Sequence, residues 1–313
     1  MYAPIITFTM NPAVDTFGET ERIFEDSKTR CQQTRQEPGG GGINVARNII
    51  RMGTPALAIF PAGGLNGELL KQLLARDNTP YQSISIASDT RQNLAITERY
   101  CGKMYHFVFP GPELTKAEQD ACRNALLEHQ QLPEFLVLSG SIADCVPASF
   151  YGEITKKASA LGIKVVLDTS GAALQGALYN GAYVAKLNRK EFSSLGYSEL
   201  DDIATLRAQM REIMAKGAVS NLIVTLAQGG ALLITESGEE LAYMPPKVEI
   251  ISHVGAGDSF VSALTHQLYQ GKSLDVAFRY GVAAASVTVQ TKGNQLYDLD
   301  LLEVTYKKTQ PLA

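Results

Sequence analysis

The sequence predicts a three-layer α/β/α fold, with helices on both faces of a mostly parallel central sheet and a small β-sheet lid beside it. From residue 114 onward, short uninterrupted apolar runs alternate with helical patterns, as expected of parallel strands that are buried on both faces. Each of these runs ends in a polar cluster. Two β-prone segments, at about 13–37 and 90–110, interrupt the alternation and predict the lid. We expect the 313 residues to form a single domain, 1–313.

The N-terminal part predicts alternating elements followed by a hairpin. Two β-prone runs flank a turn at 101–103, and we expect this hairpin and the 13–37 segment to form one small antiparallel sheet. The elements expected here are a strand at 5–10, a helix at 44–52, a strand at 57–60, a helix at about 68–75, and hairpin strands at 93–100 and 104–109.

Polar clusters follow the apolar runs of the C-terminal part. In parallel sheets, ligands bind beyond the carboxyl ends of the strands, so these clusters predict the site. The runs are 135–138, 165–167, 183–185 and 222–224, and they end in Ser139-Gly140-Ser141, Asp168-Thr169-Ser170, Lys186-Leu187-Asn188 and Thr225-Leu226-Ala227-Gln228-Gly229-Gly230.

Composition excludes several classes of protein. A net charge of −4, with Lys and Arg scattered along the chain, argues against a nucleic-acid partner. The four cysteines are far apart and predict neither a disulfide framework nor a zinc site. No apolar run is long enough to cross a membrane, and the first strand is too short for a signal peptide. We therefore expect no membrane partner and a cytoplasmic location.

A glycine-lined turn opens the helix that carries the most informative carboxylate, Asp258. The helix is indicated by an apolar stripe at 260, 263, 264 and 268. Gly255 and Gly257 leave main-chain N–H groups uncovered, so an anion can bind at the positive end of the helix dipole. Asp258 itself has two interpretations: an N-terminal cap of the helix or a functional group.

A second glycine run, Gly39–Gly42, precedes the helix of Asn44. It is either a flexible joint or a place where a ligand approaches the backbone closely, with Asn44 left inside the pocket.

Two nucleotide-binding motifs are excluded. The Gly271-Lys272-Ser273 segment has His266 where a P-loop needs glycine. The turn of Asp258 lacks the third glycine of a dinucleotide fingerprint, and the 39–42 run does not follow directly on a predicted strand.

Six motifs, each weak alone, occur in an order that covers most of the chain. Together they resemble the ribokinase-like carbohydrate kinases of the phosphofructokinase B type, over about residues 4–300, and most of all the 6-phosphofructokinases of that family. The motifs are Asn11-Pro12-x-x-Asp15, Gly39-Gly40-Gly41-Gly42-Ile43-Asn44, Ser139-Gly140-Ser141, Lys186-x-Asn188-x-x-Glu191, Thr225-Leu226-x-x-x-Gly230 and Gly255-Ala256-Gly257-Asp258.

The resemblance implies a ribokinase-like sandwich and an ATP-dependent phosphorylation of fructose 6-phosphate to fructose 1,6-bisphosphate. Asp258 would be the base, and the amides of Gly255, Ala256 and Gly257 would stabilise the developing charge. Mg²⁺ would be held through water by Asn188 and Glu191. The implied sugar-phosphate ligands are Asp15, Lys28, Arg30, Gly40, Gly41, Asn44, Arg91 and Ser141, and the implied nucleotide ligands are Lys186, Asn188, Thr225, Ala227 and Gly230.

Some of these residues have structural alternatives. Asn188 and Glu191 also fit a helix N-terminus with a solvated acid, and Lys28, Arg30 and Arg91 also fit a solvated strand face. Position 41 favours fructose 6-phosphate, because the relatives that act on fructose 1-phosphate or tagatose 6-phosphate commonly carry lysine there. Those two substrates remain the alternatives.

The chain departs from the family pattern at Leu187, Ala227 and His253. A β-carbon at 227, where the family usually has glycine, leaves a second hypothesis open: a sugar-phosphate-binding protein with a weakened ATP site. His253 is either a polar neighbour of the phosphates or a surface residue.

The alternating aromatic residues Tyr105, Phe107 and Phe109 would leave an apolar lid face exposed in a monomer, so we expect a homodimer that pairs through the lids.

Overall fold

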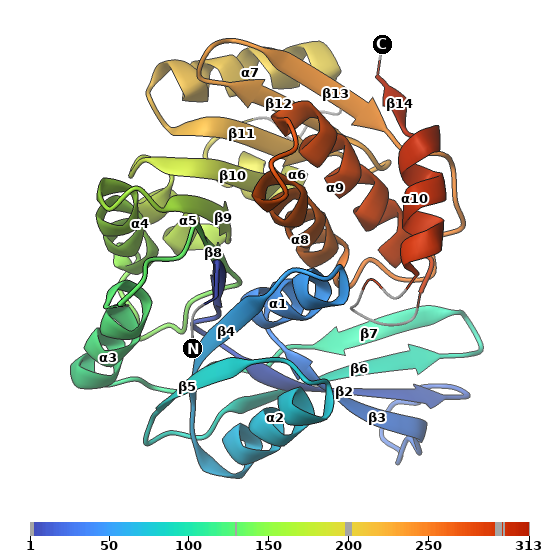
Figure 1. Ribbon diagram of the computed structural model, residues 1–313. Helices are drawn as coiled ribbons and strands as arrows, with labels where there is room; N and C mark the ends of the chain where they lie inside the picture. Colours follow the sequence, from blue (N-terminus) through green and yellow to red (C-terminus); the bar gives the residue numbers. More distant parts are fainter. Residues whose placement is uncertain (1–2, 129, 198–201, 292–295, 297, 313) are drawn as a thin grey trace.

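A computed structural model describes residues 3–128, 130–197, 202–291, 296 and 298–312, and it confirms the predicted three-layer α/β/α sandwich (Figure 1). A 10-stranded sheet in the order β14-β13-β12-β11-β10-β9-β8-β1-β4-β5 forms the central layer. Its parallel strands are β5 (Tyr81–Ser85), β4 (Ala56–Ala62), β1 (Ile5–Phe8), β8 (Phe135–Ser139), β9 (Lys164–Asp168), β10 (Ala182–Asn188) and β11 (Val219–Thr225). Three antiparallel strands complete one edge: β12 (Ala231–Thr235), β13 (Glu240–Met244) and β14 (Gln310–Pro311).

Helices cover both faces of this sheet. One face carries α3 (Lys116–Leu127), α4 (Phe150–Ala160), α5 (Gly171–Ala177), α6 (Arg189–Ser193) and α7 (Ile203–Ala215). The other carries α1 (Gly41–Arg51), α2 (Gly64–Arg76), α8 (Ala256–Tyr269) and α9 (Leu274–Thr288), with α10 (Leu299–Lys308) packed outside α8 and α9. Alternate residues of each strand contribute side chains to the two core layers, because successive side chains of a strand point to opposite faces of the sheet. On β8, Leu136 packs under the first group and Val137 under the second.

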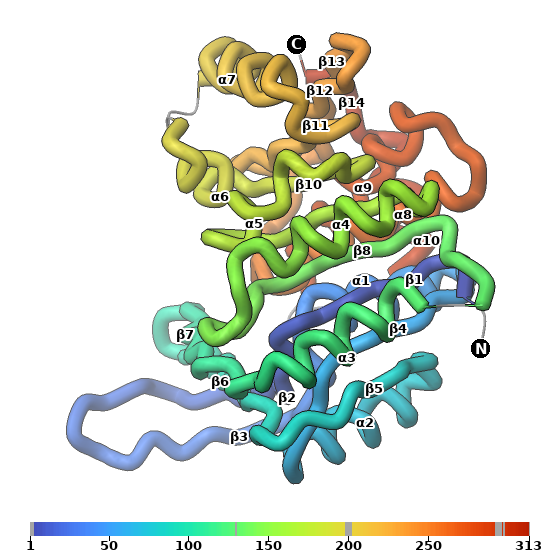
Figure 2. Tube along the Cα trace, turned by 90° about the vertical axis from the view of Figure 1, so that its left-hand side faces the viewer, coloured from blue at the N-terminus to red at the C-terminus, as the bar shows by residue number. Residues whose placement is uncertain are grey.

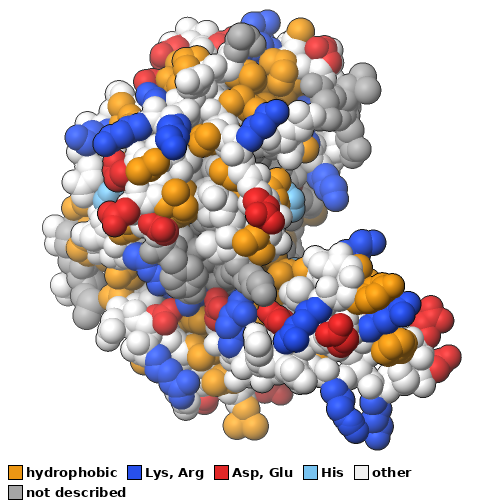
Figure 3. Space-filling model, turned by 90° about the vertical axis from the view of Figure 1, so that its right-hand side faces the viewer, with side chains coloured by type: hydrophobic (Ala, Val, Ile, Leu, Met, Phe, Trp, Pro, Cys, Tyr) orange, Lys and Arg blue, Asp and Glu red, His pale blue; other side chains and the backbone are white. Residues whose placement is uncertain are grey.

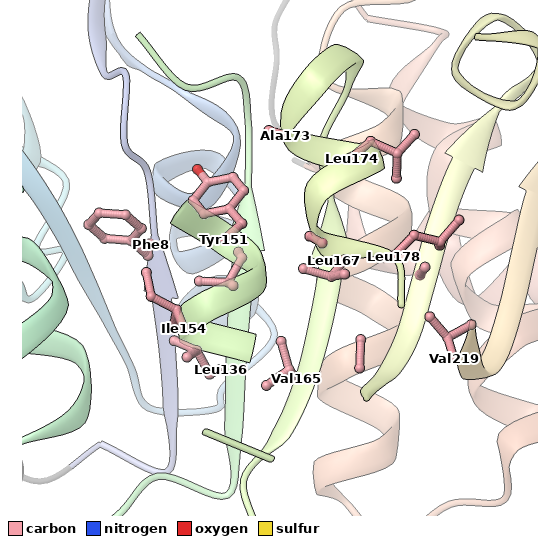
Figure 4. Packing of buried hydrophobic residues seen from close by; sticks show 14 of the residues in the cluster. Phe8, Leu136, Tyr151, Ile154, Val165, Leu167, Ala173, Leu174, Leu178 and Val219 are labelled. Atoms are coloured by element: carbon pink, nitrogen blue, oxygen red, sulfur yellow. The ribbon is translucent and has the colours of Figure 1, made fainter. Parts of the chain in front are cut away.

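The first of these core layers also holds the turn after β1 in place. In Figure 4, Tyr151 and Ile154 of α4 lie over Leu136 and Val165 of the sheet. The Tyr151 ring is completely buried, and its hydroxyl accepts a hydrogen bond from the Met10 amide at 3.4 Å. Since the segment that carries Asn11 and Asp15 begins here, packing of α4 fixes its direction.

The lid is a separate 4-stranded sheet in the order β3-β2-β6-β7, which projects from the body in Figure 2. Its strands are β2 (Ala13–Thr20), β3 (Gln32–Gly39), β6 (Arg91–Glu98) and β7 (Lys103–Phe107). The expectation of an antiparallel sheet is wrong at its centre, because β2 and β6 pair in parallel, with Asp15 opposite Asn93. Between β2 and β6 the chain passes through β3, α1, β4, α2 and β5, and so it re-enters the lid in the same direction.

Two helices begin earlier than the sequence predicts, α1 at Gly41 and α2 at Gly64. The glycines are poor helix formers, but the first turn of α1 receives help from outside the helix. Thr9 accepts a hydrogen bond from the Ile43 amide at 2.9 Å, in the way that a capping side chain would. Gly39 is the last residue of β3, so the glycine run does follow a strand directly, contrary to expectation. That strand belongs to the lid and not to the parallel sheet.

Across the described ranges, no helix combines the length and apolar character that a membrane span requires.

Candidate functional site

A cavity of about 270 Å³ lies at the carboxyl ends of the parallel strands, next to the first turn of α8. It contains seven residues that the sequence predicts for the site: Gly41, Ser141, Lys186, Glu191, Gly255, Gly257 and Asp258. Five further lining residues were not assigned a role from the sequence: Ser139, Gly140, Asp168, Thr169 and Ser170. All five belong to polar clusters that the sequence predicts at strand ends, and Ser139 and Gly140 also belong to one of the six motifs, but no individual ligand was assigned to them.

Asp258 is the third residue of α8 and does not cap it. The N-cap is Gly255, in a left-handed conformation with φ 78°, and it makes no side-chain capping bond. The Asp258 carboxylate instead accepts a hydrogen bond from the Asn44 amide of α1, at 2.9 Å. The capping interpretation is therefore wrong, and Asn44 is a direct partner of the carboxylate.

Burial raises the pKa of Asp258 to about 7, and the neighbouring charge of Asp168 adds to this effect. The hydrogen bond from Asn44 and the charge of Lys186 act in the opposite direction. A carboxylate with a pKa near neutrality is a stronger proton acceptor than an ordinary aspartate and is still ionised in a large fraction of the molecules at neutral pH. The first turn of α8 thus presents a base to the cavity.

Lys186 and Asp168 form a buried ion pair beside this base, with 2.8 Å between Nζ and Oδ1. Burial lowers the pKa of Lys186, but the charges of Asp168 and Glu191 and the hydrogen bond that Lys186 donates to Asp168 outweigh it, so the net shift is upward. The ammonium group packs against α8: a β-carbon on Gly257 would lie 2.8 Å from Nζ. A fixed positive charge therefore lies at the helix N-terminus, where it can attract phosphate.

Asn188 and Glu191 form a capping box at the start of α6. The Asn188 side chain accepts from the Glu191 amide at 2.9 Å, and the Glu191 side chain accepts from the Asn188 amide at 2.7 Å. The pair therefore does form a helix N-terminus, as one of the two interpretations predicts. Glu191 also lines the cavity, however, and is not a fully solvated acid. Burial raises its pKa, and the charge of Lys186 opposes this shift.

The acids at this end of the sheet fit a magnesium ion that keeps most of its water. Among the described residues, no group of three or more His, Cys, Asp or Glu side chains is placed to hold a metal ion directly. Mg²⁺ usually binds through one or two carboxylates together with substrate phosphates. Asp168 and Glu191 both line the cavity and supply such carboxylates.

The glycine run before α1 is closely packed and is not a flexible joint. Gly40 has φ 120°, and a β-carbon on it would lie 2.5 Å from Thr9 Cγ2. On Gly42 it would lie 2.5 Å from the Phe8 carbonyl oxygen, and on Gly41 2.3 Å from Ser139 Oγ. Side chains are excluded here because three backbone segments meet, and the backbone itself borders the cavity.

Asp15 lies on lid strand β2, outside the cavity lining. It accepts a hydrogen bond from Asn93 of β6 at 2.9 Å, and burial raises its pKa. A β-carbon on Gly39 would lie 2.3 Å from its Oδ2. Asn93 was not assigned to the site from the sequence. Its role depends on the parallel pairing of β2 with β6, which residue type alone does not reveal.

The three predicted phosphate-binding cations are not gathered at the cavity. Arg91 donates to the backbone carbonyls of Phe109 and Asn11, both at 3.0 Å, and lines a second cavity of about 360 Å³ beside the 109–112 segment. Lys28 and Arg30 are exposed in the loop between β2 and β3, at the tip of the lid. Within one chain, the lid therefore holds these two side chains away from Asp258.

The predicted nucleotide ligands Thr225, Ala227 and Gly230 lie at the end of β11 and in the turn to β12, outside the cavity lining. Ala227 is exposed in this turn, so its methyl group points away from the packed interior. Gly230 has φ 82°, and a β-carbon on it would lie 2.4 Å from the Tyr243 carbonyl oxygen. Of the other departures, Leu187 is a buried core residue and His253 is exposed outside the lining. These placements favour the surface interpretation of His253.

Residues 9–300 match the family described as pfkB family carbohydrate kinase. The chain belongs to the pfkB family of carbohydrate kinases. A curated relative, "ATP-dependent 6-phosphofructokinase isozyme 2" of Escherichia coli K12, is 38% identical over 96% of this chain and 97% of its own length.

Solved structures of E. coli phosphofructokinase-2 share the fold over nearly the whole chain. The complex with substrates and products has a TM-score of 0.90 and 38% identity, and covers 97% of this chain and 98% of that one. The tetrameric inhibited form also has a TM-score of 0.90, with 37% identity, and covers 98% and 99%. The structural likeness therefore extends over nearly the whole chain and includes the residues that match the family.

We expect the loss of activity at low pH to follow the protonation of Asp258. A base must be unprotonated to accept a proton, so we expect kcat/KM for the sugar substrate to fall about tenfold per pH unit below an apparent pKa of about 7. Initial rates between pH 5 and 9, with circular dichroism to verify folding at each pH, measure this limb. A rate that stays flat down to pH 5 would show that no group with this pKa acts as the base.

Proposed function

We propose that this pfkB kinase transfers the γ-phosphoryl group of Mg·ATP to the 1-hydroxyl of fructose 6-phosphate, with Asp258 as the base. One observation carries the proposal: a carboxylate whose pKa is raised to about 7 lies at a helix N-terminus, facing a cavity that also holds a buried lysine. The likeness to a 6-phosphofructokinase over 96% of the chain supports the choice of substrate.

In this reaction the hydroxyl oxygen forms a bond to the γ-phosphorus while the bond from phosphorus to the ADP oxygen breaks, and the hydroxyl proton passes to Asp258. Asn44 holds the carboxylate in position through its 2.9 Å hydrogen bond. The amides of Gly255 and Gly257, which line the cavity, would stabilise charge on the transferring group. The Ala256 amide is less suited, because it donates to the His253 carbonyl at 3.4 Å.

Lys186 would contact the nucleotide phosphates, and Asp168 and Glu191 would hold Mg²⁺ through water. When bound there, Mg²⁺ would supply positive charge to neutralise the phosphates. Asn188 then acts indirectly, because its capping box fixes the direction of Glu191. Thr225, Ala227 and Gly230 would border the nucleotide further from the reacting atoms. We also propose a cytoplasmic location, in which the four free cysteines would stay reduced.

For the sugar phosphate, Asp15, the Gly40–Gly41 backbone and Asn44 remain the proposed partners of the hydroxyls, and Ser141 and Arg91 of the phosphate. A panel assay that couples ADP formation to NADH oxidation tests the substrate. We expect the highest kcat/KM with fructose 6-phosphate, lower values with tagatose 6-phosphate and fructose 1-phosphate, and the lowest with unphosphorylated sugars. Activity confined to unphosphorylated sugars would contradict the assignment of the phosphate ligands.

The hypothesis of a binding protein with a weakened ATP site has little support in the geometry. Ala227 is exposed in its turn, and Asp258, Lys186 and Glu191 all lie at the cavity. We therefore expect Mg·ATP alone to raise the melting temperature of the protein. Stabilisation by sugar phosphate with none by Mg·ATP, and turnover that appears only in Ala227→Gly, would reverse this conclusion.

We further propose that the chain forms a homodimer through the lid patch, which we define by its exposed residues Phe24, Tyr100, Tyr105, Phe107, Val108 and Phe109. Figure 3 shows the lid as an arm beside a hollowed face, with hydrophobic and charged side chains together on it. An exposed sheet edge with aromatic side chains is normally covered in a stable protein. Pairing of two lids would also bring one subunit's Lys28 and Arg30 toward the site of the other.

Light scattering during size-exclusion chromatography tests the dimer. We expect twice the monomer mass of 33.8 kDa for the wild type. Phe107→Asp, at a side chain that is 50% exposed, should give the monomer. The matched control Leu65→Asp changes a residue of α2 that is 88% exposed and lies outside the patch, and it should remain dimeric. A wild-type monomer would refute the proposal.

A further inference from the structure

Ser139 carries a polar atom that nothing in the proposed reaction has yet explained. Its hydroxyl is buried, the residue is 1% exposed, and Oγ has no hydrogen-bond partner within the described part of the chain. Of the described side chains with such an unpaired buried atom, Ser139 is the one that lines the cavity of Asp258. Native proteins pair nearly all buried hydroxyl groups, because an unpaired one opposes folding. The exception therefore points to a ligand.

The surroundings of Ser139 define what that ligand can be. Ser139 ends β8 next to Asp168 of β9, and its Oγ occupies the space that a side chain at position 41 would need, 2.3 Å from an added β-carbon. The Gly140 nitrogen would lie 3.0 Å from the same carbon, so the backbone also closes this space. The hydroxyl thus lies between the end of β8 and the first turn of α1. Among the described residues that line the cavity, no other side chain has a buried polar atom without a hydrogen-bond partner.

We propose that Ser139 Oγ hydrogen-bonds a hydroxyl group of the sugar phosphate and so helps to set sugar specificity. The inference rests on the proposed function and deepens it. A sugar hydroxyl both donates and accepts, and so does serine. Ser141, whose Oγ accepts a long 3.5 Å bond from Asn11, remains the proposed phosphate partner.

Ser139→Ala removes this hydroxyl with little change in volume, and the chain offers a matched control. Thr7 on the neighbouring strand β1 is also completely buried with an unpaired hydroxyl, but it does not line the cavity. We expect Ser139→Ala to raise KM for fructose 6-phosphate about three- to tenfold, the range for one lost neutral hydrogen bond. Its KM for Mg·ATP and its kcat should change less than about twofold. Thr7→Val should leave all three constants within that limit.

Deoxy analogues of the substrate separate a direct contact from a structural effect. Wild type and Ser139→Ala are compared on fructose 6-phosphate and on its 3-deoxy and 4-deoxy analogues. We expect one analogue on which the two proteins have the same KM, because the hydroxyl that Ser139 binds is then absent. Equal losses on every sugar and on Mg·ATP would show a structural role, and a Ser139→Ala protein with the wild-type KM would show none. Either result overturns the inference.

The design also separates this inference from the proposed function. Turnover of fructose 6-phosphate by the wild type tests the function, whereas the ratio between variant and wild type tests Ser139. If another sugar phosphate is the substrate, the ratio is measured on that one. If the protein shows no turnover, the dissociation constants of the variant and the wild type for fructose 6-phosphate are compared by calorimetry. Equal constants, or a wild type that does not bind, would count against the role of Ser139.

Discussion

Asp258→Asn should lower kcat by about 10²- to 10⁴-fold, the usual contribution of a positioned base, and leave both KM values nearly unchanged. The asparagine keeps an oxygen that can accept the Asn44 hydrogen bond, so the packing of α8 against α1 is preserved. It has no group that can take the hydroxyl proton at neutral pH. Steady-state rates, together with calorimetric binding of sugar phosphate and of Mg·ATP, measure the two effects separately.

A stability measurement gives the same substitution a second, independent readout. The pKa of Asp258 is about 7 in the folded protein and near the ordinary aspartate value of 3.8 in the unfolded chain. Between these values the folded state binds more protons, so the contribution of this group to stability falls as the pH rises. Asp258→Asn should therefore melt above the wild type at pH 8, by a margin that shrinks toward pH 5.

Asp202→Asn is the control for the substitution of Asp258. Asp202 caps α7 and accepts hydrogen bonds from the amides of Ala204 and Thr205, and asparagine caps a helix equally well. It should retain wild-type rates and stability. An Asp258→Asn protein with near-normal kcat would remove the base from the mechanism and leave Asp258 as a packing residue.

Lys186→Met should lower kcat/KM for Mg·ATP by about 10²- to 10³-fold, as expected for the loss of one group that stabilises phosphoryl charge. The substitution also leaves Asp168 buried without its partner. Breaking a buried pair from one side usually costs about 3–5 kcal/mol of stability. Because Lys186 lowers the pKa of Asp258, its removal should also move the acid limb of the pH profile upward.

A double substitution separates the two roles of Lys186. In Lys186→Met with Asp168→Asn, neither charge is left unpaired, so urea unfolding should show that much of the lost stability returns. Activity should stay low, since the ammonium group is still absent. Lys216→Met breaks an exposed pair with Glu212 and should change neither property measurably. If the double variant regained activity, Lys186 would be structural only.

The body of the fold was predictable because its signals are local. Buried parallel strands such as β8 and β9 appear as short apolar runs, and the polar clusters after them mark the edge that carries the cavity. The lid was only partly predictable. Its β-prone segments are visible, but the parallel pairing of β2 with β6 depends on the path of the chain through the body. The antiparallel strands β12 to β14 were not predicted, because their sequence resembles a continuation of the alternating strand and helix pattern.

The site shows the same division between residue type and placement. Asp258, Lys186 and Gly41 were identified from motifs, and the structure brings them to one cavity. Their partners were not all foreseeable. Asp168 becomes significant only through its contact with Lys186, and Ser139 only because its buried hydroxyl has no hydrogen-bond partner among the described residues. Such pairings join residues that are far apart in the chain, so sequence spacing does not report them.

Phosphorus NMR of the purified protein with fructose 6-phosphate and Mg·ATP tests the central claim most directly. We expect a new phosphate resonance on carbon 1 of the sugar, with one ADP formed for each bisphosphate and with formation suppressed in Asp258→Asn. Release of inorganic phosphate in its place, or a phosphorylated product formed at the wild-type rate by Asp258→Asn, would contradict it.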